Sequence, residues 1–373
     1  MQKRYSIIDI TAYVFFLCIG LSNCLTTSQI EAPQVITMGL IFLAGIALIC
    51  SYFQSTKINP AGLFFSIIIL VVGVISYVYM GGLAFLRTAL FILIAHGLSY
   101  KKIITYNNKM LLVAMLIIVF SSIIGITEMR WTGTSDKIFY QHVVYTFGFR
   151  NPNTPPILIF ALITGYNLIQ KNTIKYKTIF VEFIINAIAF YLFESRTAAG
   201  VTAVYLLAIA LLQKRSVFSV SKLILWPMKY LFLIGTLLTL YLVINFDVAD
   251  AAWQDINLLM SGRLYYWQGF IQTYGYQAFG NNMSLNKDPL DNSFLYLLIY
   301  NGYIALIIYN IIFLYISNYA YKKNNILLFI TVIATEVYCF TESTPLNFSF
   351  SPVLLYFASL IMTKEPVAKK SIE

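Results

Sequence analysis

Five of the seven arginines in this 373-residue chain stand beside or between apolar segments, in places that membrane topology does not explain. An arginine side chain is always charged, and its planar fork of donors grips phosphate oxygens two at a time. Arginines held near the ends of helices would therefore suit a site for phosphate or pyrophosphate. The five are Arg87, Arg130, Arg150, Arg196 and Arg263.

Two of these arginines stand where helices are predicted to begin. Arg150 lies in Phe-Gly-Phe-Arg-Asn-Pro-Asn, before a helix that Asn153 or Thr154 would cap, and Arg196 opens another helix in Glu-Ser-Arg-Thr. A cation at a helix N-terminus faces the positive end of the helix dipole, so local electrostatics do not favour it there. A bound anion at the helix N-terminus would stabilise the arginine in this position. The plainer alternatives are capping for the first segment and a weak surface pair with Glu194 for the second.

Arg263 is followed by aromatic residues in Arg-Leu-Tyr-Tyr-Trp. In a helix, Arg263, Trp267 and Phe270 would share one face. Phosphate binding competes here with the simpler interpretation of an interfacial anchor in an aromatic belt. The same two interpretations are open for Arg87, a few residues inside an apolar segment, whereas Arg130 has the sequence context of an anchor.

Two residues are candidates for a proton acceptor. Asp291 precedes a helix predicted from Phe294 to Ile316, where it is either an ordinary cap or a carboxylate facing a substrate hydroxyl. His142 lies in the first outer loop and could titrate near neutral pH, although a lone loop histidine is more often incidental. The sequence holds no P-loop, GxGxxG, HExxH or metal-ligand cluster. We therefore expect no cofactor and no metal.

The elements that would position these residues are apolar runs of about 16–22 residues, long enough to cross a hydrocarbon core of ~30 Å. The chain is 59% hydrophobic and only 11% charged. We predict an all-α, polytopic membrane protein of about 12 transmembrane helices. The predicted spans are 8–24, 34–53, 62–79, 83–98, 110–129, 154–170, 178–193, 197–213, 230–246, 296–319, 325–341 and 350–363.

The distribution of basic residues fixes the expected orientation. With both termini in the cytoplasm, 18 of the 25 lysines and arginines fall in cytoplasmic connections, as the positive-inside rule requires. The net charge of +10 is then mainly a topology signal and does not suggest nucleic acid binding.

Residues 1–373 are expected to form a single membrane domain with two larger outer loops, about 130–153 and 247–292. The second loop mixes polar residues with leucines and aromatic residues. This composition is typical of a partly folded, amphipathic segment on the membrane surface.

In their order along the chain, these motifs resemble those of the Wzy-type polysaccharide polymerases, which are similar to O-antigen ligases. The resemblance rests on Phe-Gly-Phe-Arg-Asn-Pro-Asn and Ser-Arg-Thr at two helix starts. Arg-xxx-Trp, Gly-Asn-Asn and Asp-Asn-Ser then follow in the last large loop. It implies a glycosyltransferase of GT-C-like architecture in the bacterial cytoplasmic membrane. Such an enzyme would use neither a nucleotide sugar nor a metal.

The resemblance also implies substrates and partners. The enzyme would join oligosaccharide repeat units of capsule, exopolysaccharide or O-antigen, each carried on undecaprenyl pyrophosphate at the outer face of the membrane. Besides membrane lipid, its partners would be a chain-length regulator and the flippase of the same pathway.

The family's functional residues can be carried onto this sequence. Arg150, Arg196 and Arg263 match the functional arginines of the family. Asp291-Asn292 aligns with the family's His-Asn or Asp-Asn pair at a helix entry, where a base is expected, and Asn292 would bind the substrate. Exposed rings such as that of Trp267 could stack on sugars. The sequence departs from some polymerases, which have glycine eleven residues after the arginine, because residue 274 is tyrosine.

Two other functions remain open at this stage. A ligase would use the same chemistry to transfer the finished glycan to another acceptor. A flippase of lipid-linked saccharide should instead line a central cavity with charge throughout its depth. The predicted spans are nearly free of charge apart from Arg87, Glu182 and Glu336, and the remaining charge gathers at the outer rim. This distribution favours an enzyme.

Overall fold

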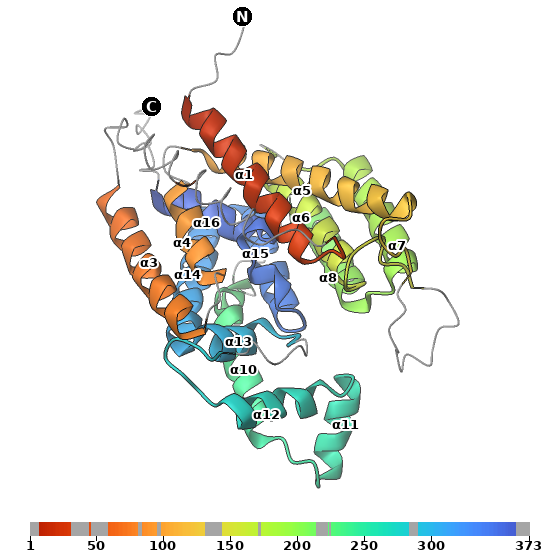
Figure 1. Cartoon of the computed structure of the whole chain (residues 1–373), viewed down its shortest axis with the longest axis vertical. Coiled ribbons are helices and arrows are strands. Elements are labelled where there is room, and N and C mark those ends of the chain that lie inside the picture. Colours follow the sequence, from red (N-terminus) through yellow and green to blue (C-terminus); the bar gives the residue numbers. More distant parts are fainter. Residues whose placement is uncertain are drawn as a thin grey trace, which may run out of the picture. The chain divides into compact units, whose positions relative to one another are not determined.

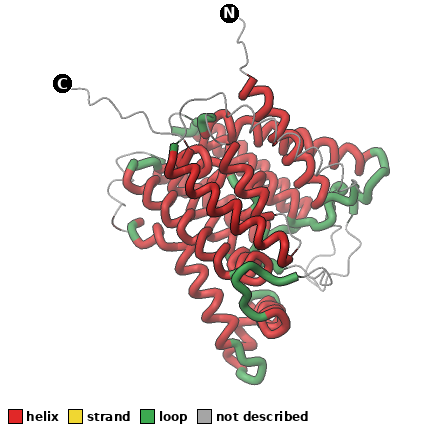
Figure 2. The backbone as a smooth tube through the Cα atoms, turned by 60° about the vertical axis from the view of Figure 1, so that its left-hand side comes forward, coloured by secondary structure: helices red, strands yellow, loops and turns green. Residues whose placement is uncertain are grey.

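The computed structural model describes residues 7–30, 45, 59–80, 84–94, 98–130, 144–170, 173–213, 223, 225–282 and 290–362. Helices make up most of these residues, and no strand occurs among them (Figure 2). Within this part of the chain, five helical stretches are long and apolar enough to cross a membrane. They are α3 (Pro60–Met80), α5 (Tyr100–Ile123), α7 (Tyr176–Phe193), η1 (Pro227–Tyr230) with α10 (Leu231–Asn245), and α14 (Tyr303–Lys322). The prediction of an all-α chain is thus confirmed for the described residues, and the five long apolar helices fit a helical membrane protein. The number of crossings and the GT-C-like architecture stay predictions.

Shorter apolar helices account for most of the other predicted spans. The predicted span 34–53 lies almost entirely outside the described residues. The shorter helices are α1 (Ile7–Thr26), α4 (Ala84–Ile94), α6 (Thr154–Leu168), α8 (Arg196–Leu212), α15 (Ile326–Cys339) and α16 (Pro352–Met362). At ~1.5 Å of rise per residue, the 14 residues of α15 are too few to cross the hydrocarbon core as a regular helix.

The chain divides into two compact units. The first comprises Met1–Phe65, Leu90–Leu207 and Phe348–Glu373, and the second comprises Ser66–Ala89 and Ala208–Asn347. The candidate residues are divided as well. Arg150 and Arg196 belong to the first unit, and Arg87, Arg263 and Asp291 belong to the second.

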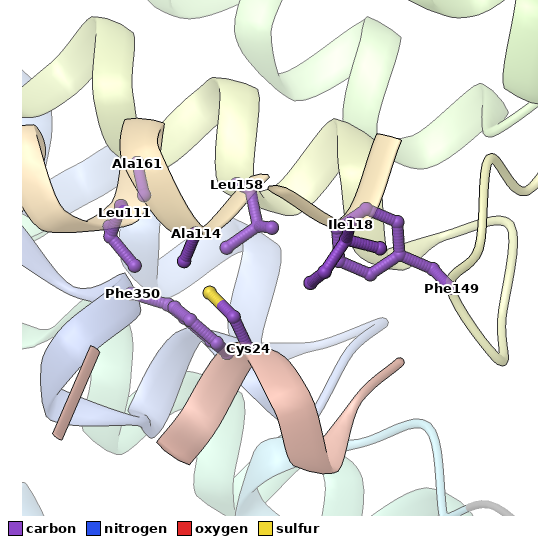
Figure 3. Packing of buried hydrophobic residues seen from close by; sticks show 8 residues of the cluster. All are labelled: Cys24, Leu111, Ala114, Ile118, Phe149, Leu158, Ala161 and Phe350. Carbon is purple, nitrogen blue, oxygen red and sulfur yellow. The ribbon is translucent and has the colours of Figure 1, made fainter. Parts of the chain in front are cut away.

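In the first unit, α5 packs against α1, α6 and α16 (Figure 1). Its apolar core joins side chains from α1, α5 and α6, from the segment before α6 and from the 3-10 turn η4 (Phe348–Phe350) before α16. Figure 3 shows this cluster, which consists of Cys24, Leu111, Ala114, Ile118, Phe149, Leu158, Ala161 and Phe350. Helices α5 and α6 can pack closely because Ala114 and Ala161, which lie between them, have small side chains.

One end of the first unit is fastened by the segment that carries Arg150. The backbone N–H of Arg150 donates to Thr27 O at 2.9 Å, that of Gly148 donates to Glu128 O at 2.9 Å, and that of Tyr145 donates to Leu192 O at 3.0 Å. These bonds gather the chain just after α1 and α5 and the last turn of α7. The alternating topology predicted from the sequence requires those three helix ends to lie on the same side.

The start of α5 differs from the prediction. The span was expected at 110–129, but the helix runs from Tyr100 to Ile123. Ser99 caps the earlier start by accepting a hydrogen bond from Lys102 N, and Gly125, with a φ of +82°, lies just past the end. Hydropathy missed the first turns because they contain lysines, which a helix accepts without difficulty at a membrane surface.

In the second unit, α14 packs against α15 and α10, and the predicted span 296–319 is broken. A short helix α13 (Ser293–Tyr296) continues into a π-helical turn, η2 (Leu297–Asn301), and α14 starts only after Gly302. Gly302 has a φ of +89°, and a Cβ there would lie 2.2 Å from Ala278 O. The break exists because the segment before it docks here, with Tyr303 N donating to Gln277 O at 3.0 Å.

The second outer segment contains two helices, α11 (Ala251–Leu259) and α12 (Arg263–Tyr274), joined by a tight turn through Gly262 (Figure 1). No residue of α11 is buried, and Leu258 and Leu259 are strongly exposed. Helices therefore form within the segment predicted as the second outer loop, while its place on the membrane surface stays a prediction.

The close contact at Gly302 gives a first test. Gly302→Ala should lower the stability of the full chain in detergent, because the backbone conformation alone costs a non-glycine residue about 1–3 kcal/mol and the added Cβ meets backbone. Gly269→Ala in α12 is the matched control, because a Cβ there meets nothing within 4 Å. Equal thermal unfolding midpoints for the two variants would contradict the fold at this position.

Candidate functional site

The second unit brings Arg263 and Asp291 together, although 27 residues separate them in sequence. Arg263 Nη2 lies 4.0 Å from Asp291 Oδ2, and the two side chains are 26% and 28% exposed. Arg263 is the first residue of α12, and the start of that helix is fixed by Asn257, whose Oδ1 accepts from Leu264 N at 3.0 Å. The partly exposed guanidinium can bind an anion on one side. On its other side, the neighbouring carboxylate can accept a proton.

Trp267 does not present its ring to a substrate as we expected. Its side chain is only 2% exposed and packs edge-on against Phe340, with ring centroids 6.0 Å apart. The expectation of an exposed stacking surface at Trp267 is therefore wrong. One helical turn after Arg263, the indole anchors α12 to the chain beyond α15. The neighbouring rings of Tyr265 and Tyr266 are exposed instead.

Asn292 is fully buried and bonded to the protein. Its Oδ1 accepts from Leu295 N at 2.9 Å, which makes it the N-cap of α13. Its Nδ2 donates to Phe340 O at 2.9 Å and to Thr239 Oγ1 at 3.4 Å. The geometry thus gives Asn292 a positioning role next to Asp291 instead of the substrate contact that we expected.

Sequence reasoning missed two residues at this junction. Ser293 Oγ donates to the backbone oxygen of Glu342 at 2.5 Å, and the Glu342 side chain is buried. The available signal was the polar run Thr-Glu-Ser-Thr between two apolar helices. The predicted spans 325–341 and 350–363 leave most of this run in the connection between them.

Arg87 approaches the same helix entry from α4. Its half-buried guanidinium interacts electrostatically with the hydroxyl of Tyr296 in α13, which is also stacked on Tyr300. Tyr296 follows Asp291 by five residues. The second unit therefore brings two of the predicted arginines to the segment that begins at Asp291.

Arg150, in the first unit, has a structural contact of its own. Its Nε donates to Ser28 O at 2.7 Å, which fastens the segment before α6 to the end of α1, while the side chain remains exposed. Asn153 is the N-cap residue of α6 but makes no side-chain capping bond, so the predicted side-chain cap is not formed there. Arg150 thus has a local reason for its position besides anion binding.

Arg196 is exposed at the first residue of α8, as predicted. The chain turns sharply just before it, because Glu194 adopts a left-handed conformation with a φ of +50°. Asn186 of α7 donates to Ala199 O at 3.0 Å and holds the first turn of α8 against α7. Arg196 is thereby fixed at the end of a helix pair.

The remaining candidates stay predictions. His142 lies outside the described residues, and Arg150 and Arg196 belong to a different unit from Arg263. A single site that contains all three arginines is thus still a prediction from sequence. No family model, no curated protein and no solved structure matches this chain.

The contrasting burial of two neighbouring aromatic residues gives a second test. Trp267→Ala should reduce the free energy of unfolding by about 3–5 kcal/mol, because it empties a buried site between α12 and Phe340. Tyr266→Ala, which removes a ring that is 62% exposed, should change it by less than about 0.5 kcal/mol. Denaturant unfolding in detergent measures both, and a larger loss for Tyr266→Ala would refute this assignment.

Proposed function

We propose that this protein is a membrane glycosyltransferase that joins lipid-linked oligosaccharide repeat units at the outer face of the bacterial cytoplasmic membrane. The observation that carries the proposal is the half-exposed Arg263–Asp291 pair at the entry of a broken helix in a helical membrane protein. Support also comes from the Wzy-type motifs. Arg263 and Asp291 belong to two different motifs, and they lie next to each other in the structure.

The proposed reaction needs a charge stabiliser and a proton acceptor. An acceptor sugar hydroxyl attacks the anomeric carbon of the donor sugar, and a new carbon–oxygen bond forms. The bond from that carbon to the pyrophosphate oxygen breaks, and its electron pair leaves with the undecaprenyl pyrophosphate. Arg263 stabilises the negative charge on the departing group, and Asp291 takes the hydroxyl proton.

The distance of 4.0 Å between Arg263 Nη2 and Asp291 Oδ2 suits an ion pair that must separate when a pyrophosphate binds to Arg263. A half-exposed ion pair of this length is held only weakly, because water screens the two charges. A pyrophosphate offers Arg263 more than one oxygen and can take the guanidinium fork in two-point contact. Binding of the donor would then leave the Asp291 carboxylate near the acceptor hydroxyl.

The other arginines extend the proposal. Arg87 supplies a second positive charge near the helix entry, and the exposed rings of Tyr265 and Tyr266 offer stacking surfaces for sugars. Arg150 and Arg196 would bind further phosphate oxygens, as the resemblance implies. In the proposed orientation both termini lie in the cytoplasm.

The buried carboxylates argue against a flippase. Glu182 accepts a hydrogen bond from Asn167 at 3.1 Å, and Glu336 accepts one from Ser317 at 3.2 Å. Each carboxylate is therefore used between two neighbouring helices of its own unit. Such bonds stabilise helix packing in a membrane and do not require a transport path.

The test is to delete the protein in its host, size the lipid-linked saccharides and assign them to a leaflet. Single repeat units on the outer leaflet would establish a polymerase. Single units on the inner leaflet would mean a flippase, and long lipid-linked chains that are not transferred would mean a ligase.

Complementation then tests the site itself. Arg263→Ala should lower turnover by about 10²–10³-fold, the typical effect of removing one well-placed charge-stabilising donor. Arg130→Ala, at another exposed outer arginine, should restore the wild-type rate. Turnover of the donor by Arg263→Ala protein at the wild-type rate would remove the central claim.

A further inference from the structure

The segment that follows α12, residues 275–282, is irregular but held in place at several points. Ser76, near the end of α3, donates a hydrogen bond to Phe279 O at 2.7 Å. Asn281 donates to Ile299 O at 3.0 Å through its backbone N–H and, also at 3.0 Å, through its side-chain amide. These bonds tie the segment to α3 and to the turn η2 that follows α13 (Figure 1). The side chains of the segment are therefore presented from a fixed backbone.

The segment belongs to a long stretch without charge. Between Arg263 and Lys287 the sequence contains no charged residue, but it is rich in aromatic rings and amide side chains. Helix α3, against which the segment lies, has no charged residue either. An anionic ligand would require basic residues here. The composition of this stretch fits an uncharged ligand instead.

Two aromatic rings form an exposed pair where the segment meets α3. The rings of Tyr79 and Phe279 are nearly parallel, with 17° between their planes and 6.1 Å between their centroids. Rings in full face-to-face contact would be ~3.5–4 Å apart, so these two are displaced sideways and neither covers the other's face completely. Tyr79 is 67% exposed, and Phe279 is partly exposed. The neighbouring side chains of Tyr276 and Gln277 are exposed as well.

Tyr79 lies at the edge of the lipid-facing surface of α3. The most exposed apolar side chains of this helix form one stripe along its length. They are Phe64, Ile67, Ile68, Val71, Val74 and Val78. Tyr79 lies beside this stripe, on the side of Val72 and Ser76, which precede it by seven and three residues and are buried. Its ring thus borders the segment 275–282 and not the middle of the lipid-facing surface.

The segment connects this ring pair to the proposed site on both sides. Toward the N-terminus, the 12 residues of α12 lead back to Arg263. Toward the C-terminus, Asn281 is bonded to Ile299, in the turn that follows α13 and Asp291. At ~1.5 Å of rise per residue, α12 places the rings within about 20 Å of Arg263. An oligosaccharide of several sugars can span this distance.

We infer that the rings of Tyr79 and Phe279 bind an uncharged sugar in the saccharide part of a lipid-linked substrate, several sugars away from the reacting bond. This inference rests on the proposed function and adds a saccharide subsite to it. One face of many pyranose rings consists mainly of C–H groups, and it can be buried against an aromatic ring while the hydroxyl groups stay at the rim. Tyr276 and Gln277 offer that rim groups that donate and accept hydrogen bonds.

The experiment measures the binding of a saccharide that carries no phosphate. The repeat-unit oligosaccharide, released from the host's lipid carrier and labelled at its reducing end, is titrated into the full chain. The detergent has no sugar headgroup, because such a headgroup would compete for the rings. Tyr79→Ala should bind the oligosaccharide at least about fivefold more weakly than wild type, as for a residue at the centre of a contact.

Three variants serve as controls. Tyr79→Phe keeps the ring and should bind as wild type does. Tyr191→Ala is the matched control, because Tyr191 is a 75% exposed tyrosine near the end of another membrane helix, α7, and its loss should leave the affinity unchanged. Arg263→Ala should also keep its affinity, because this oligosaccharide has no phosphate for the guanidinium.

The inference is overturned if Tyr79→Ala binds as tightly as wild type, if Tyr79→Phe loses as much affinity as Tyr79→Ala, or if wild type shows no measurable binding. An equal loss in Tyr191→Ala or Arg263→Ala would overturn it too, since the binding would then not depend on this ring pair. Should Tyr79→Ala fail to fold, Tyr79→Leu replaces it. Leucine keeps an apolar contact with Phe279 but has no ring, and unchanged affinity would again refute the inference. Polymer formation by wild type is assayed separately, so the proposed function can fail while this binding result stands.

Discussion

The structure of the second unit depends on one constraint, which is that backbone polar groups inside a bilayer need partners within the protein. Regular helices meet this requirement along most of the described chain. Where the helices break, side chains supply the missing bonds: Ser76 donates to Asn301 O beside Gly302, and Asn292 and Ser293 donate to the carbonyls of Phe340 and Glu342. Each break thus requires a polar residue nearby, and such residues lie beside both of these breaks. A polar substrate could bind there without leaving further backbone groups of the protein without hydrogen bonds.

The sequence predicted most helices correctly because hydropathy and length are enough to identify a membrane span. It did not predict the interruption at Gly302, because the apolar run continues through this position and hydropathy carries no information about φ. Nor did it predict that α15 ends at Cys339, since Phe340 is as apolar as the residues before it. Both errors concern backbone conformation, which is set by tertiary contacts such as the approach of Ala278 to Gly302.

Residue types with few structural uses were easier to single out from the sequence than types with many. Arg263 and Asp291 were selected separately, and their pairing could not be inferred because it depends on how α12 lies against the entry of α13. Trp267 was misjudged because a tryptophan near a membrane surface can face either lipid, solvent or protein. Glu342 was overlooked because a polar connection between two spans is ordinarily an exposed turn, whereas its side chain is buried in the protein.

The position of Arg263 meets two opposing requirements of the proposed phosphate site, namely that the guanidinium be neither fully buried nor fully exposed. A guanidinium in a fully dry environment would need a tightly bound carboxylate, and such a pair would exclude a phosphate because separating it leaves an uncompensated charge. A fully exposed guanidinium would bind phosphate weakly, since water screens the interaction. Arg263 is about one quarter exposed and lies 4.0 Å from Asp291, between these limits. The carboxylate lies beside the guanidinium without occupying all of its donors, and the burial of Trp267 one turn later keeps the start of α12 in place. Both features are what the proposed exchange of Asp291 for a pyrophosphate requires.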